Sequence, residues 1–94
     1  MFRTMDGYAW DPAKAAANLR KHAVDFADAA LSLEDPAALL VADPDASGEQ
    51  RFVCLGADPQ ARVLVIVYAQ AGDAVRFISS RRASRGERRR YEKR

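Results

Sequence analysis

Three apolar segments in the second half of the chain lie so close together in sequence that they leave few ways to fold. They span residues 51–56, 63–68 and 74–79, and turn-forming pairs, Asp58-Pro59 and Gly72-Asp73, separate them. Such short connections favour antiparallel hairpins. The middle segment is apolar on both faces, as expected of a central strand that is covered on both sides. The sequence therefore predicts an antiparallel sheet, to which residues 39–42 add a further short strand.

Two helices are predicted before this sheet. Asp11-Pro12 indicates a helix start, because Asp accepts from free N–H groups and Pro gives up a donor that would have no partner there. Helix-forming residues continue from there to His22. Asp25 caps a second helix over residues 26–33, and Asp35-Pro36 ends it because the residue before Pro disfavours the α conformation. Residues 2–10, which are rich in aromatic side chains, predict either a short first strand or an irregular aromatic segment.

A last helix is expected at the basic C-terminus. Ser84 and Glu87 have the spacing of a capping box, so this helix begins near Arg85. It offers only Tyr91 for packing, and Gly86 costs about 1 kcal/mol relative to Ala. The expected fold class is α+β: two N-terminal helices packed on an antiparallel sheet of about four strands, with a C-terminal basic helix, all in a single domain over residues 1–94.

The charge is unevenly distributed. The net charge is only +2, but residues 23–50 hold seven acidic residues and no Lys or Arg, whereas residues 76–94 hold nine basic residues and two acidic ones. This asymmetry predicts a basic surface for nucleic acid or for an acidic partner. The alternative is that the two halves neutralise one another in the fold.

Several functional classes find no support in the sequence. No apolar run approaches the roughly 18 residues of a membrane span, and no basic-then-apolar leader opens the chain, so a cytoplasmic protein without a membrane partner is expected. The only cysteine, Cys54, is expected to be a small buried hydrophobic residue. No nucleotide-binding motif is present, and one His and one Cys do not make a metal set, so neither a cofactor nor a metal is expected.

The remaining polar residues suit phosphodiester chemistry, in which charge stabilisation contributes much of the catalysis. On the last strand, alternation places Arg76, Ile78 and Ser80 on one face, and Val75, Phe77 and Ser79 on the other. Arg76 would then emerge from the sheet, and arginines clamp phosphate oxygens without losing their charge. An ion pair of Arg76 with Glu49 or Asp73 is the structural alternative.

Three further residues could take part in this chemistry. His22, the only histidine, ends a helix and suits general acid work, although a capping or surface role is the commoner one. Glu49 precedes a strand and could accept the proton of a 2′-hydroxyl, or it is a solvated loop acid. Tyr91 lies near arginines, a combination on which RNA bases stack, or it packs on the sheet.

The chain resembles the BrnT toxins of bacterial type II toxin–antitoxin modules. The resemblance is carried by these segments: Trp10-Asp11-Pro12-Ala13-Lys14, Asn18-Leu19-Arg20-Lys21-His22, Val24-Asp25-Phe26, Ala29-Ala30, Asp35-Pro36, Glu49-Gln50-Arg51-Phe52, Leu64-Val65-Ile66-Val67-Tyr68 and the stretch from Arg76 to Tyr91. It implies a RelE-like ribonuclease fold and cleavage of RNA, including ribosome-associated messenger RNA, that inhibits translation as part of a stress response. It also implies a BrnA-type antitoxin that neutralises the toxin, and binding to operator DNA only through that antitoxin.

The resemblance and the residue types together give the candidate site. The residues expected to carry catalysis are His22, Glu49, Arg76, Arg81 and Tyr91. Those expected to bind RNA are Lys21, Arg51, Ser79, Arg82, Arg85 and Arg88. Two positions depart from the family pattern: Ala46 stands where a His is expected, and Ala71 where an Arg is expected.

These departures keep a second hypothesis open, in which the chain is a catalytically weakened toxin that acts mainly as an antitoxin-binding partner and co-repressor. A third hypothesis, a basic DNA-binding protein without a toxin role, rests on the C-terminal arginines alone. No helix-turn-helix signature precedes them.

Overall fold

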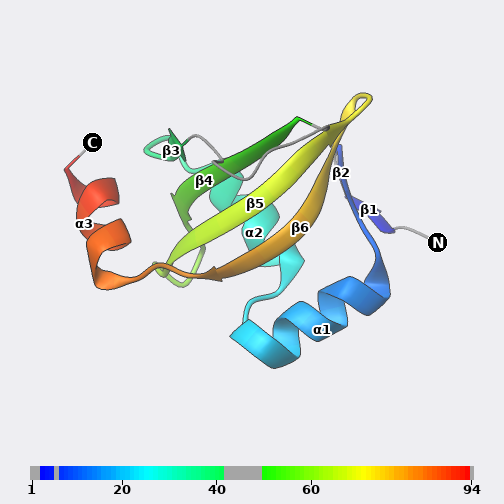
Figure 1. Cartoon of the computed structure of the whole chain (residues 1–94), viewed down its shortest axis with the longest axis horizontal. Coiled ribbons are helices and arrows are strands. Elements are labelled where there is room, and N and C mark those ends of the chain that lie inside the picture. Colours follow the sequence, from blue (N-terminus) through cyan, green and yellow to red (C-terminus); the bar gives the residue numbers. More distant parts are fainter. Residues whose placement is uncertain (1–2, 6, 42–49, 94) are drawn as a thin grey trace.

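The described residues form a mixed sheet of six strands, in the order β1-β2-β6-β5-β4-β3, around which the fold is organised (Figure 1). The structure is a computed structural model and describes residues 3–5, 7–41 and 50–93. The strands are β1 (Arg3–Met5), β2 (Tyr8–Trp10), β3 (Leu39–Val41), β4 (Arg51–Ala57), β5 (Val63–Ala71) and β6 (Ala74–Arg82). The helices are α1 (Pro12–His22), α2 (Phe26–Leu33) and α3 (Arg85–Glu92).

The predicted antiparallel arrangement holds for β3 to β6, but the sheet as a whole differs from the prediction. The first residues form two strands, joined at Gly7 in a left-handed backbone conformation (φ +89°), which glycine adopts without strain. β2 then pairs in parallel with β6, through Tyr8 with Val75 and Ala9 with Arg76. The prediction of about four strands, all antiparallel, was therefore wrong: the described residues form six strands, and one pair is parallel.

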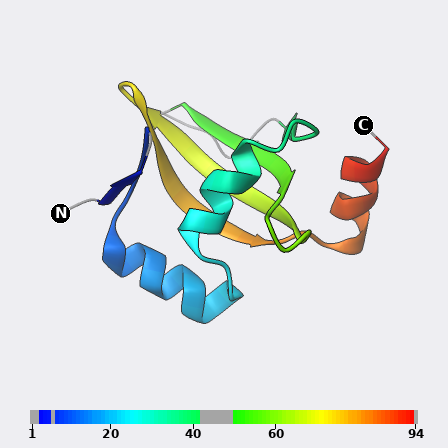
Figure 2. The same ribbon diagram turned by 180° about the vertical axis from the view of Figure 1, so that it is seen from behind.

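The two N-terminal helices also lie differently from the prediction. The side chains of Asp11 and Asp25 cap α1 and α2 as expected, and α2 packs across β4, β5 and β6 (Figure 2). In contrast, α1 lies beside the edge of β6 rather than over a face of the sheet (Figure 1). Only α2 fits the expectation of a helix packed on the sheet. We call the sheet face that α2 covers the inner face, and the opposite one the outer face.

The core lies between α2 and the inner face. Phe26 of α2 contacts Phe77 of β6 with ring centroids 5.5 Å apart, and Trp10 packs at the edge of the Phe26 ring. Leu64 and Ile66 of β5 are fully buried in the same cluster. Gly56 lets α2 approach closely, since a Cβ there would lie 2.3 Å from the Ser32 carbonyl oxygen.

An irregularity in β6 changes the predicted faces of that strand. Tyr68 pairs with Phe77, but the preceding Val67 pairs with Ser79, so Ile78 is an extra residue at a β-bulge. Because alternation restarts after the bulge, Ser80 pairs with the buried Ile66 and turns to the inner face. The predicted grouping of Arg76, Ile78 and Ser80 was therefore wrong.

In the part of the chain that the structure describes, no helix is long and apolar enough to cross a membrane.

Candidate functional site

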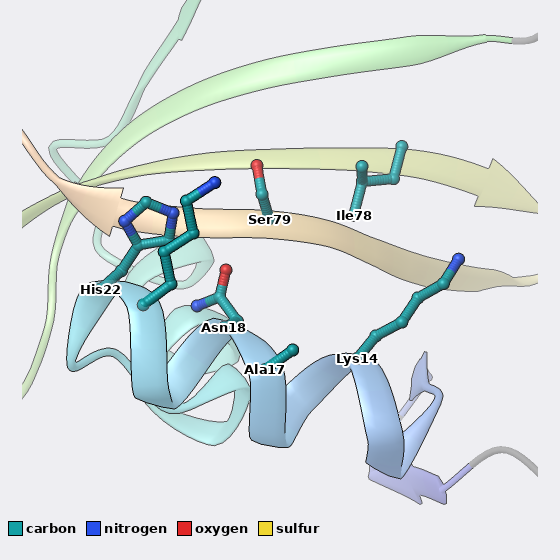
Figure 3. Close-up of a pocket in the computed structure, with 7 residues that line it drawn as sticks. Lys14, Ala17, Asn18, His22, Ile78 and Ser79 are labelled. Carbon is teal, nitrogen blue, oxygen red and sulfur yellow. The ribbon is translucent and has the colours of Figure 1, made fainter.

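A groove between α1 and β6 brings together polar side chains from both elements (Figure 3). It has a volume of about 250 Å³, and its lining residues are Lys14, Ala17, Asn18, Lys21, His22, Ile78 and Ser79. Those from α1 recur every three or four positions, so they share one face of the helix. Three residues predicted for the site, Lys21, His22 and Ser79, therefore lie around one groove.

Asn18 fixes the width of this groove. Among the described residues, β2 pairs with β6 at Val75 and Arg76 alone, so the later residues of β6 have no described strand on that side. The Asn18 side chain takes the place of a strand: its Nδ2 donates to the Ser80 carbonyl (2.8 Å), and its Oδ1 accepts from the Ser80 N–H (3.1 Å). Nδ2 also donates to the Val24 carbonyl (3.0 Å), which ties α1 to the start of α2.

His22 and the two lysines lie along the groove. His22 is half-buried in the last turn of α1, which ends at Ala23 in the left-handed conformation (φ 59°). Figure 3 shows the His22 ring beside the later part of β6, and Lys14 extending from the first turns of α1 toward the earlier part of that strand. Lys14 and Lys21 are exposed. The groove therefore presents an imidazole at one end and an ammonium group at each end.

The outer face of β6 adjoins this groove. Because of the bulge, Arg76, Ser79 and Arg81 all lie on the outer face, opposite Ala69, Val67 and Val65 of β5. Ser79 belongs to both regions, since it also lines the groove. The bulge thus aligns two predicted arginines with the predicted serine, an alignment that regular alternation would have prevented.

A second arginine shares the row of Arg76. Ala69 pairs with Arg51 of β4 on one side and with Arg76 of β6 on the other. The Cα atoms of the two arginines are therefore two strand spacings apart, about 10 Å. Both side chains are partly buried. At this end of the outer face, two arginines flank the small residue Ala69, one on each neighbouring strand.

Arg81 is engaged in a bidentate ion pair at the other end of β6. Its Nη1 and Nη2 donate to the two carboxylate oxygens of Glu87, at 2.8 and 2.9 Å. Glu87 also completes the predicted capping box with Ser84. The hydrogen bonds from Arg81 lower the pKa of Glu87 to about 2, and the same contact raises the pKa of Arg81. This pair joins the end of β6 to the start of α3.

Tyr91 is engaged in a second contact that holds α3. Its hydroxyl donates to Oδ2 of Asp35, which also accepts from the Ala57 N–H (2.9 Å). Both views show α3 beyond the ends of β4 and β6, away from α1 (Figures 1 and 2). Tyr91 therefore lies apart from the groove that contains His22.

The remaining candidates are distributed as follows. Arg82, Arg85 and Arg88 are exposed at the end of β6 and on α3. Glu49 and Ala46 lie outside the described residues, and Ala71 ends β5. Cys54 is buried as predicted, and this burial raises its thiol pKa to about 11. Within the described ranges, no group of three or more His, Cys, Asp or Glu side chains could hold a metal ion.

Lys14 and Asn18 were not predicted as site residues. A signal for them was present, because residues 14, 18 and 21 share one helical face with His22. What the sequence could not show is that this face meets the edge of β6, 62 positions away from Asn18 along the chain.

Comparison with known proteins found a similar solved structure and a matching family. The structure resembles the crystal structure of the Brucella abortus ribonuclease toxin BrnT, with a TM-score of 0.64 and 26% sequence identity, over 81% of this chain and 94% of that one. No curated protein matches the chain. Residues 10–87 match the family of ribonuclease toxins, BrnT, of type II toxin-antitoxin systems. With most of its length matched, the chain belongs to the BrnT family of ribonuclease toxins.

Proposed function

We propose that this protein is an RNA-cleaving toxin whose reaction takes place where the α1–β6 groove meets the outer face of β6. The observation that carries this proposal is the meeting of His22 and Lys21 with Ser79, on a strand whose outer face also carries Arg76. A proton-transfer group beside a lysine, with an arginine on the same strand, matches what cleavage of a phosphodiester needs.

The proposed reaction is attack of a ribose 2′-oxygen on the adjacent phosphorus. The new bond joins this oxygen to phosphorus, and the bond from phosphorus to the 5′-oxygen of the next nucleotide breaks. A base removes the 2′-hydroxyl proton, and an acid protonates the leaving 5′-oxygen. The products are a 2′,3′-cyclic phosphate and a free 5′-hydroxyl, so no further reactant is consumed.

The residues are assigned to these roles by their positions. His22 transfers a proton at the groove, and Arg76 and Lys21 stabilise the charge that develops on the phosphate oxygens. Glu49, which precedes β4, is the second proton-transfer candidate. Arg81 and Tyr91 were predicted to be catalytic, but their contacts with Glu87 and Asp35 favour the role of holding α3 in place.

The reaction is tested with purified protein and a fluorescent single-stranded RNA. His22→Ala should lower the cleavage rate by about 100-fold or more, as expected for loss of a general acid or base. Arg20→Ala is the matched control, because Arg20 is exposed on the same helix and does not line the groove. Cleavage by the parent protein should persist in EDTA and leave a cyclic phosphate. A folded His22→Ala variant with the parental rate would contradict the assignment.

The biological part of the proposal is that RNA cleavage in the cytoplasm inhibits translation, and that a BrnA-type antitoxin neutralises the toxin and links it to operator DNA. Membership of the family supports an antitoxin partner. Induced expression should arrest growth, and co-expression of the adjacent open reading frame should restore it. Arrest that no neighbouring gene product relieves would count against the pairing.

The second candidate is a weakened toxin that serves mainly as a partner of the antitoxin. It is favoured by one sequence observation: Ala46 and Ala71 replace the His and Arg of the family pattern. If this candidate is correct, the double change Ala46→His and Ala71→Arg should increase RNA cleavage strongly while leaving antitoxin binding unchanged. An unchanged cleavage rate in the double variant would exclude it.

A further inference from the structure

Lys14 lies at the end of the groove opposite to His22 and has no role in the reaction described above. It precedes Lys21 by seven residues on the same face of α1, which places their Cα atoms about 10.5 Å apart along the helix axis. Ala17 lies between them with a small side chain, and Ile78 and Ser79 of β6 line the opposite side of the groove (Figure 3). The groove is therefore a short channel with a cation at each end.

The charges of this channel are unbalanced. None of its seven lining residues is acidic. The nearest acidic residues along the chain, Asp11 and Asp25, accept from the backbone at the starts of α1 and α2. Within the described ranges, Lys14 and Lys21 form no ion pair. A concave site with two cations and no anion is suited to an anionic ligand that supplies more than one charge.

The size of the groove narrows the choice of ligand. A volume of about 250 Å³ is below the usual range of roughly 300–1,000 Å³ for small-molecule pockets. It suits the sugar-phosphate of one strand better than a whole nucleotide ligand or a duplex. Because lysine side chains are flexible, the two ammonium groups can move close enough together to contact neighbouring phosphates of such a strand.

We propose that Lys14 binds a phosphate next to the one that is cleaved, so that the groove holds two successive phosphates of single-stranded RNA. This inference rests on the proposed function, because it places the cleaved phosphate at the Lys21 and His22 end. Lys14 then contributes to substrate binding and to the position of the RNA strand along the groove. Its loss should raise the KM and leave the kcat nearly unchanged, whereas loss of His22 should lower the kcat.

Binding is measured with a 2′-O-methyl single-stranded RNA of mixed sequence, which lacks the attacking hydroxyl. Each phosphate contact contributes about 0.7 to the slope of log affinity against log salt for a single strand. Lys14→Ala should reduce this slope by about that amount and weaken binding about 5- to 10-fold, whereas Lys14→Arg should restore both. Arg20→Ala, exposed on the same helix but outside the groove, is the control and should leave the slope less affected.

The contacted phosphate is identified with a neutral methylphosphonate placed at each position of a cleavable RNA in turn. At one position beside the cleavage site, the methylphosphonate should raise the KM of the parent protein. At the same position it should leave the KM of Lys14→Ala unchanged, because the variant no longer contacts that phosphate. Equal effects on both proteins at every position would overturn the inference. So would a Lys14→Ala variant that loses antitoxin affinity but keeps the parental RNA affinity and salt slope, because the groove would then serve the antitoxin.

The outcomes separate this inference from the proposed function. If the parent protein cleaves RNA and Lys14→Ala matches it in KM and salt slope, only the inference fails. If no RNA is cleaved but Lys14→Ala reduces the slope, the assignment of the groove to RNA stands and the proposed reaction fails. If the parent protein does not bind RNA, both fail.

Discussion

At the scale of single residues, the Asn18 side chain joins α1 to β6 and to the residue before the cap of α2. It is buried and serves both hydrogen-bonding groups of the Ser80 backbone, as well as the Val24 carbonyl. Buried polar groups that lose their partners retain the cost of their desolvation. Asn18 therefore stabilises the fold and also sets the spacing of the groove that it lines.

We expect Asn18→Ala to lower the free energy of unfolding by about 2–4 kcal/mol, because two buried backbone groups of Ser80 lose their partner. Asn18→Asp should be at least as harmful, since a carboxylate would face the Ser80 and Val24 carbonyl oxygens. Urea unfolding measures both changes. Arg20→Ala, at an exposed position of α1, should stay within about 0.5 kcal/mol of the parent. An Asn18→Ala variant as stable as this control would contradict the role of Asn18.

At the scale of elements, two glycines occupy opposite environments. Gly56 of β4 faces α2, where an added Cβ would lie 2.3 Å from the Ser32 carbonyl oxygen. At Gly86 of α3, such a Cβ would have no described atom within 4 Å other than those of its chain neighbours and of its own helix backbone. The same substitution therefore tests helix–sheet packing at one position and helix propensity at the other.

We expect Gly56→Ala to destabilise the protein by about 1–3 kcal/mol, because the backbone of α2 must move away. Gly86→Ala should instead stabilise α3 by up to about 1 kcal/mol, since alanine is the better helix former. Thermal unfolding reports the first change, and amide hydrogen exchange within α3 reports the second. If both substitutions changed the stability in the same direction, the surroundings described for one of the two glycines would be contradicted.

The attachment of α3 should depend on pH through Glu87. Its pKa lies at about 2, below the ordinary value of 4.5, because Arg81 and the Ser84 backbone bind the ionised form. The native state thus binds fewer protons than the unfolded chain between these pH values. The contribution of Glu87 is present above about pH 4.5 and is lost as the pH falls toward 2.

We expect Glu87→Gln to lower the stability by up to about 1 kcal/mol at pH 7, since the partly exposed ion pair is screened by solvent. The difference from the parent should shrink as the pH is lowered to 2. Urea unfolding at pH 7, 4 and 2 measures it. Glu92→Gln, an exposed change on the same helix, is the control and should show no such trend. A difference that is constant with pH would exclude the Arg81–Glu87 pair as its cause.

At the scale of the whole molecule, one aromatic cluster joins the two ends of the chain. Phe77 of β6 lies 5.6 Å from Tyr8, 5.9 Å from Trp10 and 5.5 Å from Phe26, measured between ring centroids. These contacts join β2, α2 and β6 in a single core. A domain of this size has a total stability of roughly 5–14 kcal/mol, so the contribution of one buried ring is a large fraction of that stability.

We expect Phe77→Ala to lower the free energy of unfolding by about 3–5 kcal/mol, through lost burial and the cavity left behind. Trp10 fluorescence and far-ultraviolet circular dichroism should report the same midpoint, because the cluster belongs to one cooperative unit. Phe52→Ala, which removes a partly buried ring stacked on Tyr68, should have a smaller effect. Two separate transitions in the parent protein would contradict the single core.

The features that the sequence by itself determined are those set by interactions between residues close together in the chain. The caps at Asp11, Asp25 and Ser84 and the short turns between β4, β5 and β6 each depend on a few neighbouring residues. The helices therefore begin where they were predicted, and this half of the sheet is antiparallel as expected. The roles of His22, Glu49, Arg76, Arg81 and Tyr91 remain predictions, because contacts alone do not test catalysis.

Only the tertiary structure decided which side chains meet. The bulge at Ile78 exchanges the faces on which the later side chains of β6 lie, and no pattern in the neighbouring residues predicts the bulge. The parallel pairing of β2 with β6 brings α1 alongside β6, and Asn18 then closes the open edge of that strand. The physical reason is that strand pairing and edge closure depend on residues more than sixty positions apart, whose joint burial no local pattern encodes.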